Sequence, residues 1–167
     1  MALHEQPVGA SSEWRTPSYV FEALGCTFDL DVASPGKSIA PWIPARKHIT
    51  AKSLTTPWHG FVWMNPPFGG RNGLIPWLDK FVQHGNGVAL VPDRTSAPWW
   101  QTFVLRAELV LFVSPKIAFI GIDGKPGTSP AQGTSLLAIG DRGRAALRTA
   151  ARNGLGIMFE PIESDWA

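Results

Sequence analysis

Residues 65 to 68 combine an amide, two prolines and an aromatic ring in the order Asn65-Pro66-Pro67-Phe68. They come directly after the apolar run 60–64, which is typical of a short buried strand. A residue before proline is kept out of the helical region, and here this applies to two consecutive residues, so the turn is stiff and extended. Because neither proline has an N–H group, the carbonyl oxygen of Pro66 can point into a cleft beside the side-chain carbonyl of Asn65.

Two rigid acceptors followed by an aromatic ring suit a planar target that carries an NH₂ group. The exocyclic amine of a nucleobase is a poor nucleophile, because its lone pair is delocalised into the ring. Acceptors that take both of its hydrogens favour a pyramidal nitrogen, and Phe68 can stack on the ring and fix its plane. The alternative is a tight Pro-Pro turn that is closed by a core phenylalanine.

The composition predicts one globular domain without a membrane span. The chain has 167 residues, of which 44% are hydrophobic, and its net charge of +2 neither demands nor excludes a polyanionic partner. Cys26 is the single cysteine, so an internal disulfide is impossible and a reducing cytoplasm is the expected location. The histidines and Cys26 do not form a metal-binding pattern, and we assign no metal.

Hydrophobic periodicity and turn residues predict the elements of the fold. A Thr16 N-cap followed by Pro17 at the first helical position should open the first helix. Helices are expected over residues 18–25, 73–85, 97–107 and 141–154. Strands are expected over residues 27–33, 60–64, 87–92, 108–113, 116–121, 134–140 and 155–162. Residues 1–13 should form a loose lead-in, and 14–167 one domain with loop insertions near 34–58 and 122–133.

Strands that alternate with helices predict an α/β fold with a mostly parallel sheet and helices on both faces. Such sheets bind ligands at the carboxyl ends of their strands. Asp31 and Asn65 both fall at predicted strand ends, so we expect both to project into one crevice.

Asn65-Pro66-Pro67-Phe68 matches the motif [DNS]-P-P-[YFW] of amino-methyltransferases that use S-adenosylmethionine. The blocks "SSEWRTP", "FDLDVAS", "LVPDRTSAPWW" and "SPKIAFIG" stand in the same order as in phage-type DNA adenine methyltransferases. Over roughly residues 12–140 the chain therefore resembles that family. The resemblance implies a Rossmann-like methyltransferase sheet, S-adenosylmethionine as the cofactor and DNA as the partner.

The resemblance also implies roles for individual residues. Asn65, Pro66, Pro67 and Phe68 would be catalytic. The cofactor would be bound by Trp14, Thr16, Pro17, Asp31, Ser53 and Asn65, with Asp29 as the second choice for the acid. Alternatives are a plain helix cap for Thr16 with a core Trp14, and an exposed strand acid for Asp31. The glycine-rich turn of many methyltransferases is absent after "FDLD", and Ser53 stands where relatives often carry an acid.

DNA contacts are expected from basic residues in loops and after strands. The 34–58 loop supplies Arg46 and Lys47. The resemblance further implies that Arg94, after a strand, contacts a phosphate and that Lys116 and Phe119 line the base side of the site. A surface salt bridge is the alternative for Arg94, and a plain strand is the alternative for Lys116 and Phe119. The adenine must be flipped out of a duplex or met unpaired.

The function of this site has open alternatives. The same motif could methylate the amine of cytosine, of an RNA base or of a protein glutamine. A third possibility is a DNA-binding relative without catalytic activity, which would fit the missing glycine-rich turn and the serine at position 53.

Overall fold

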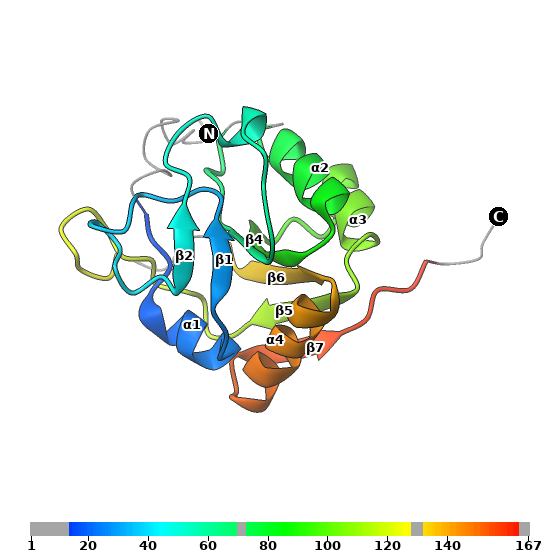
Figure 1. Cartoon of the computed structure of the whole chain (residues 1–167). Coiled ribbons are helices and arrows are strands. Elements are labelled where there is room, and N and C mark those ends of the chain that lie inside the picture. The colour runs from blue at the N-terminus through cyan, green and yellow to red at the C-terminus, as the bar shows by residue number, and fades with distance from the viewer. Residues whose placement is uncertain (1–13, 70–72, 128–131, 164–167) are drawn as a thin grey trace, which may run out of the picture.

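The computed structural model describes residues 14–69, 73–127 and 132–163. The predicted lead-in over 1–13 and residues 128–131 of the predicted 122–133 loop lie outside this part of the chain. The described residues form one seven-stranded sheet with four α-helices and a short 3-10 helix (Figure 1). The strands are β1 Phe28–Asp31, β2 Ala45–His48, β3 Val62–Met64, β4 Gly87–Pro92, β5 Leu109–Val113, β6 Thr134–Ile139 and β7 Gly156–Phe159. The helices are α1 Ser18–Leu24, η2 Ser53–Thr55, α2 Ile75–His84, α3 Pro98–Val104 and α4 Asp141–Arg152.

The strand order in the sheet is β2-β1-β3-β4-β6-β5-β7. Pairings on the β2 side, from β2 to β4, are parallel, whereas β6 runs antiparallel to both β4 and β5, and β7 runs antiparallel to β5. The prediction of a mostly parallel sheet is therefore wrong, because half of the pairings are antiparallel. The cause is the connection from β5 to β6, whose described residues contain no helix. Parallel neighbours are usually joined by a helical crossover, and without one the chain returns in the opposite direction.

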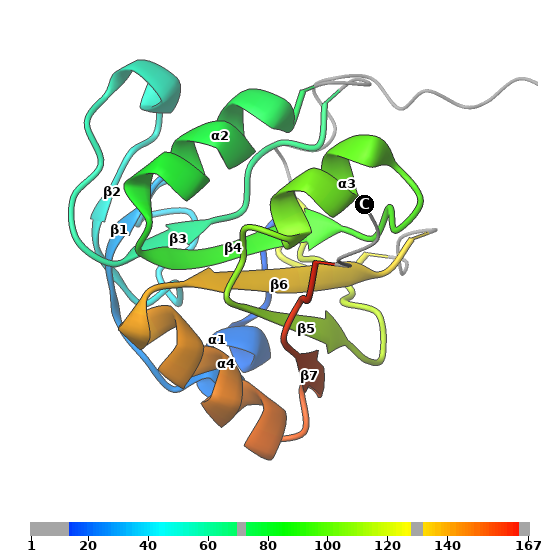
Figure 2. The same cartoon turned by 90° about the vertical axis from the view of Figure 1, so that its right-hand side faces the viewer.

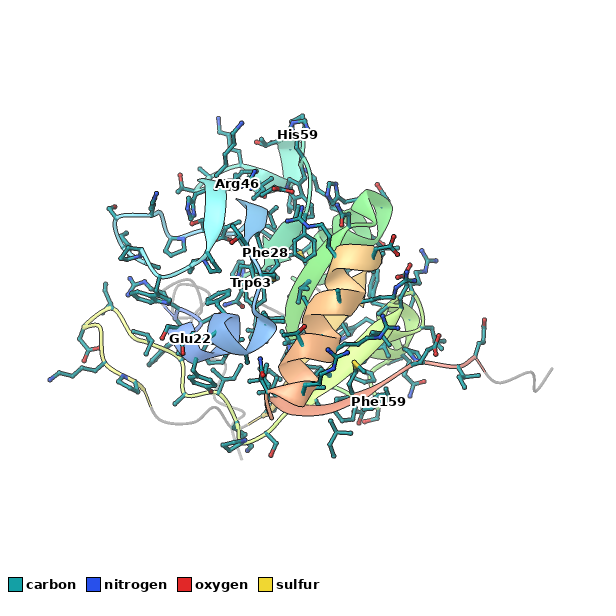
Figure 3. The ribbon with its side chains drawn as sticks, turned by 60° about the horizontal axis from the view of Figure 1, so that its bottom comes forward. Glu22, Phe28, Arg46, His59, Trp63 and Phe159 are labelled. Atoms are coloured by element: carbon teal, nitrogen blue, oxygen red, sulfur yellow. The ribbon has the colours of Figure 1, made fainter. Side chains whose placement is uncertain are left out.

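Helices cover both faces of the sheet, as predicted (Figure 2). The side chains of α1 and α4 pack into one core cluster, and those of α2 and α3 pack into a second cluster on the other face. The first cluster contains an aromatic group in which the rings of Phe21 and Trp63 meet edge to face with centroids 4.9 Å apart. Figure 3 shows Phe28 and Trp63 in the interior near α1, and Arg46 on the outside. Within the described residues, no helix has the length and apolar character that crossing a bilayer requires.

The first helix covers Ser18–Leu24 of the predicted 18–25 and is closed by Gly25 as expected, but Pro17 lies just before its first residue instead of being that residue. Pro17, with extended backbone angles, is the N-cap of α1, so Thr16 does not cap the helix. At the other end Gly25 adopts the left-handed conformation with φ of 62° and donates its N–H to Phe21 O. A glycine tolerates this conformation without steric cost, which explains why the helix ends there.

Two segments differ from the predicted strands. The 116–121 segment is no strand and forms only isolated bridges, which link Ile120 to Arg15 and to Pro126. It cannot join the sheet beside β5, because β6 and β7 already occupy both edges of that strand. In contrast, β2 was missed inside the predicted 34–58 loop, since its exposed residues Arg46 and Lys47 hide the apolar alternation of an edge strand.

Candidate active site

A pocket of about 510 Å³ opens at the carboxyl ends of β1, β2 and β3. Because these three strands are parallel, the segments that follow them meet at one edge of the sheet. In Figure 1 this edge faces the segment that carries η2. The pocket is lined by Val32, Ala33, Ser34, Pro35, Ile49, Thr50, Ala51, Lys52, Ser53, Leu54, Thr55, Asn65, Pro67 and Trp77.

The Asn65-Pro66-Pro67-Phe68 turn lies at this pocket. Asn65 and Pro67 line it, Pro66 is buried, and Phe68 is half-buried against the core cluster on the side of α2 and α3. The side-chain amide of Asn65 donates from Nδ2 to Oγ1 of Thr16 over 3.0 Å. With its NH₂ group held there, the Asn65 amide has its carbonyl oxygen available as an acceptor.

Asp31 lies beneath the pocket wall, with an exposed fraction of only 1%. Its Oδ1 accepts a hydrogen bond from the N–H of Ala33, a pocket residue, over 3.3 Å. Its Oδ2 is buried without a hydrogen-bond partner and lies 3.8 Å from Nδ1 of His48. Burial raises the pKa of Asp31 to about 6, and the opposing effects of the nearby Ser34 side chain and of the Ala33 N–H on this pKa are smaller. This carboxyl group therefore shapes the turn after β1 and has one oxygen unsatisfied.

Ser53 also lines the pocket, and the segment that carries it is held by Lys80 of α2. The ammonium group of Lys80 donates to the carbonyl oxygens of Ser53, Leu54 and Thr56 over 2.8, 3.1 and 2.5 Å. The indole N–H of Trp58 donates to Ser53 Oγ over 3.0 Å, and Lys80 Nζ lies 4.8 Å from the centre of that ring. Ser53 Oγ thus already accepts one hydrogen bond, and its hydroxyl proton can still be donated to a ligand.

Asp29 does not reach the pocket. It lies two residues before Asp31 in β1, toward the amino ends of the strands, and its Oδ2 accepts from Phe61 N at 2.8 Å and from Arg142 at 2.7 Å. The hydrogen bond from Phe61 N, followed by the Arg142 guanidinium, lowers the pKa of the Asp29 carboxyl. Arg46 lies 4.0 Å from the same carboxylate, which places it away from Asn65.

The three N-terminal residues that the resemblance assigned to the cofactor differ in their exposure to solvent. Thr16 and Pro17 are buried beside the turn and α1, and neither lines the pocket. Trp14 is 41% exposed. Its ring covers Gly121 and Gly127 so closely that a Cβ atom at Gly127 would lie 2.3 Å from it.

The remaining predicted DNA contacts are exposed, with one exception. Lys47, Arg94 and Lys116 lie on the surface. Arg94 follows the carboxyl end of β4, at the same edge of the sheet as the pocket, because β4 is parallel to β3. Phe119 is buried in the core cluster of α1 and α4, so it does not line the base side of the site.

Sequence reasoning missed the roles of several residues at the site. His48 ends β2 beside Asp31, and its Nδ1 lies 2.9 Å from Ser34 Oγ. Trp77 packs against the core cluster of α2 and α3 and also lines the pocket, where its ring lies 6.5 Å from that of Trp58. Lys80 was missed as well, because its partners at residues 53–56 lie far from it in the chain and no local pattern marks them.

A family model for DNA N-6-adenine-methyltransferase (Dam) matches residues 5–151. Searches of curated proteins and of solved structures found no match. The match spans every strand of the sheet except β7, and it includes the pocket and the Asn65 turn. The chain belongs to the DNA N-6-adenine-methyltransferase family, whose members methylate the exocyclic amine of adenine in DNA.

Proposed function

We propose that this adenine methyltransferase binds S-adenosylmethionine in the pocket at the ends of β1, β2 and β3. The volume of about 510 Å³ lies in the range of small-molecule sites. Ile49, Leu54 and Trp77 supply apolar walls for an adenosine group. The hydroxyl group of Ser53 supplies a polar contact in the wall, and the unsatisfied oxygen of Asp31 lies just beneath it. The apolar walls suit the flat adenine ring of the cofactor, and the polar groups suit its hydrogen-bond donors.

We further propose that Asn65 Oδ1 and Pro66 O accept the two hydrogens of the adenine amine. When bound, the cofactor supplies an electrophilic methyl group on a sulfonium. The methyl group would pass to the lone pair of the amine nitrogen, with the electron pair of the former C–S bond left on sulfur. The nitrogen then loses one proton to water. The contribution of the chain is to hold the amine in line with the methyl group and to stabilise the developing charge on nitrogen.

Phe68 would stack on the adenine ring after the base has left the duplex. Flipping a base costs a few kcal/mol, which stacking and phosphate contacts offset. Arg94 is the basic candidate best placed for a phosphate contact, since it follows β4 at the pocket edge. Lys116 and Lys47 are further candidates on the surface.

The fold is consistent with this proposal. Strands β2, β1, β3 and β4 are parallel around the pocket, and antiparallel β6 lies between β4 and β5. We interpret this as a Rossmann-like methyltransferase sheet in a single domain over 14–167. We place its activity in the cytoplasm, where a reduced Cys26 and accessible DNA are expected.

The observation that carries the proposal is that Asn65 lines the pocket with its amide held by hydrogen bonding to Thr16. The test is mass spectrometry of nucleosides from DNA that has been incubated with protein and cofactor. Wild type should produce N6-methyladenine. Replacing Asn65 by Ala removes one of two acceptors and should lower turnover by about 10²–10³-fold. Asn153→Ala is the matched control, because Asn153 is exposed and only donates to Ala23 O.

Other outcomes would assign a different function. If no methyladenine forms and the product is instead methylcytosine, a methylated RNA base or methylated glutamine, the target is the amine of that group and not that of adenine. DNA binding without cofactor uptake in calorimetry would support the non-catalytic relative and contradict the proposal.

A further inference from the structure

We propose that Thr16 is a positioning residue, which keeps the carbonyl end of the Asn65 amide turned toward the reacting amine. The inference rests on the proposed function of Asn65. Its geometric basis is the 3.0 Å hydrogen bond from Asn65 Nδ2 to Thr16 Oγ1. Thr16 is 1% exposed and does not line the pocket, so it has almost no surface to offer a ligand. Its hydroxyl group therefore acts on Asn65 and not on the cofactor.

The chemistry of an amide explains why such a partner is needed. The two ends of the Asn65 side chain have nearly the same shape but opposite hydrogen-bonding character. Only the orientation with Oδ1 outward gives the adenine amine an acceptor. In that orientation the NH₂ group faces inward, and a buried donor without a partner costs about 1–3 kcal/mol. The Thr16 oxygen accepts from this inward NH₂ group and so removes the cost of the active orientation.

Thr16 is itself fixed by a second hydrogen bond. The indole N–H of Trp42, in the segment between β1 and β2, donates to the main-chain oxygen of Thr16 over 2.8 Å. The segment before α1, the β1–β2 connection and the turn after β3 are therefore joined by two hydrogen bonds in series. The position of Thr16, and with it the Asn65 amide, depends on contacts that lie outside the pocket.

The test compares Thr16→Val, which keeps the shape and loses the hydroxyl, with Thr16→Ser, which keeps the hydroxyl. Thr16→Val should lower kcat about tenfold while the dissociation constant of the cofactor changes by less than about twofold. Thr16→Ser should restore kcat to within about threefold of wild type. Thr102→Val is the matched control, because the exposed Thr102 hydroxyl only donates to Pro98 O inside α3. Thermal unfolding of each variant checks that it is folded.

A second variant changes the position of Thr16 without altering Thr16 itself. Trp42→Phe removes the N–H donor to Thr16 O and keeps an aromatic ring, and it should lower kcat about threefold without changing cofactor affinity. If Thr16→Val retains the wild-type kcat, the proposal is wrong. It is also wrong if cofactor affinity falls in step with kcat, since Thr16 would then act on the cofactor.

A measurement without turnover separates this proposal from the proposed function. In ¹⁵N-labelled protein, the side-chain amide signals of Asn65 are those that disappear in Asn65→Ala. They should move in Thr16→Val and stay in place in Thr102→Val. If wild type methylates no DNA, the proposed function is wrong. Independently of that result, unchanged Asn65 signals in Thr16→Val would show that Thr16 does not hold the amide.

Discussion

Oδ2 of Asp31 lies 3.8 Å from Nδ1 of His48, and the two side chains meet at the ends of adjacent parallel strands beneath the pocket. Burial raises the pKa of Asp31 to about 6 and lowers the pKa of His48, so that both groups are shifted toward their neutral forms. Lys37 contributes to the lowered pKa of His48. The pair is therefore a buried polar contact that costs stability when the carboxyl group ionises.

We expect Asp31→Asn to change how stability depends on pH. The pKa of Asp31 is about 6 in the folded protein against 3.8 as the ordinary value, so the folded state holds this proton more tightly. The stabilising contribution is fully present below about pH 4 and is lost as the pH rises through about 6. From pH 4 to pH 7, the variant should gain on the order of 3 kcal/mol relative to wild type, as measured by urea unfolding.

Asp79→Asn is the control for this experiment, because Asp79 is an exposed carboxyl on α2. His48 is present in all three proteins, so its own titration largely cancels in the differences. A difference between Asp31→Asn and wild type that stays constant from pH 4 to pH 7 would mean that Asp31 titrates as an ordinary acid.

Lys80→Met should weaken cofactor binding from a distance. Lys80 donates to three carbonyl oxygens of the segment that forms one wall of the pocket, and a methionine leaves them without this donor. We expect a stability loss of about 2 kcal/mol and a cofactor dissociation constant about tenfold higher. Urea unfolding and calorimetry measure the two effects. Lys125→Met, on an exposed loop, should change neither. Unchanged cofactor affinity in Lys80→Met would show that this wall takes no part in binding.

Arg94→Gln should weaken DNA binding more than Arg46→Gln does. Arg94 follows β4 at the edge that carries the pocket, whereas Arg46 lies beside Asp29 near the amino ends of the strands. Loss of one phosphate contact should reduce the slope of log affinity against log salt by about one. Titrations of a labelled duplex at several salt concentrations measure this slope. A larger change in slope for Arg46→Gln would show that DNA binds near the amino ends of the strands instead.

The sequence predicted the parts of the fold that depend on local pattern. The helices α1 to α4 and the buried strands β4, β5 and β6 are apolar or amphipathic segments with clear ends, and the structure contains all of them. It did not predict the direction of β6, because that direction depends on the β5–β6 connection. The 116–121 segment has a strand-like pattern, yet its apolar residues Ile117 and Phe119 are buried without an available strand edge.

The site was predictable where a motif marks the chemistry and hidden where long-range contacts create it. Asn65 lies at the pocket, as its position after a strand indicated. The sequence ranked Asp31 before Asp29 as the acid, but both lie in one short strand and only the structure shows which end of it each one is near. Lys80 was hidden, because its contacts with residues 53–56 join segments that are far apart in the chain.

The place of β6 between β4 and β5 has a consequence during synthesis of the protein. Until residues 134–139 have left the ribosome, the edges of β4 and β5 that later flank β6 have no partner, although the whole pocket has already been made. Unpaired edges of apolar strands invite association between nascent chains. Fragments that stop before β6 should therefore aggregate even though they carry every residue given above as lining the pocket.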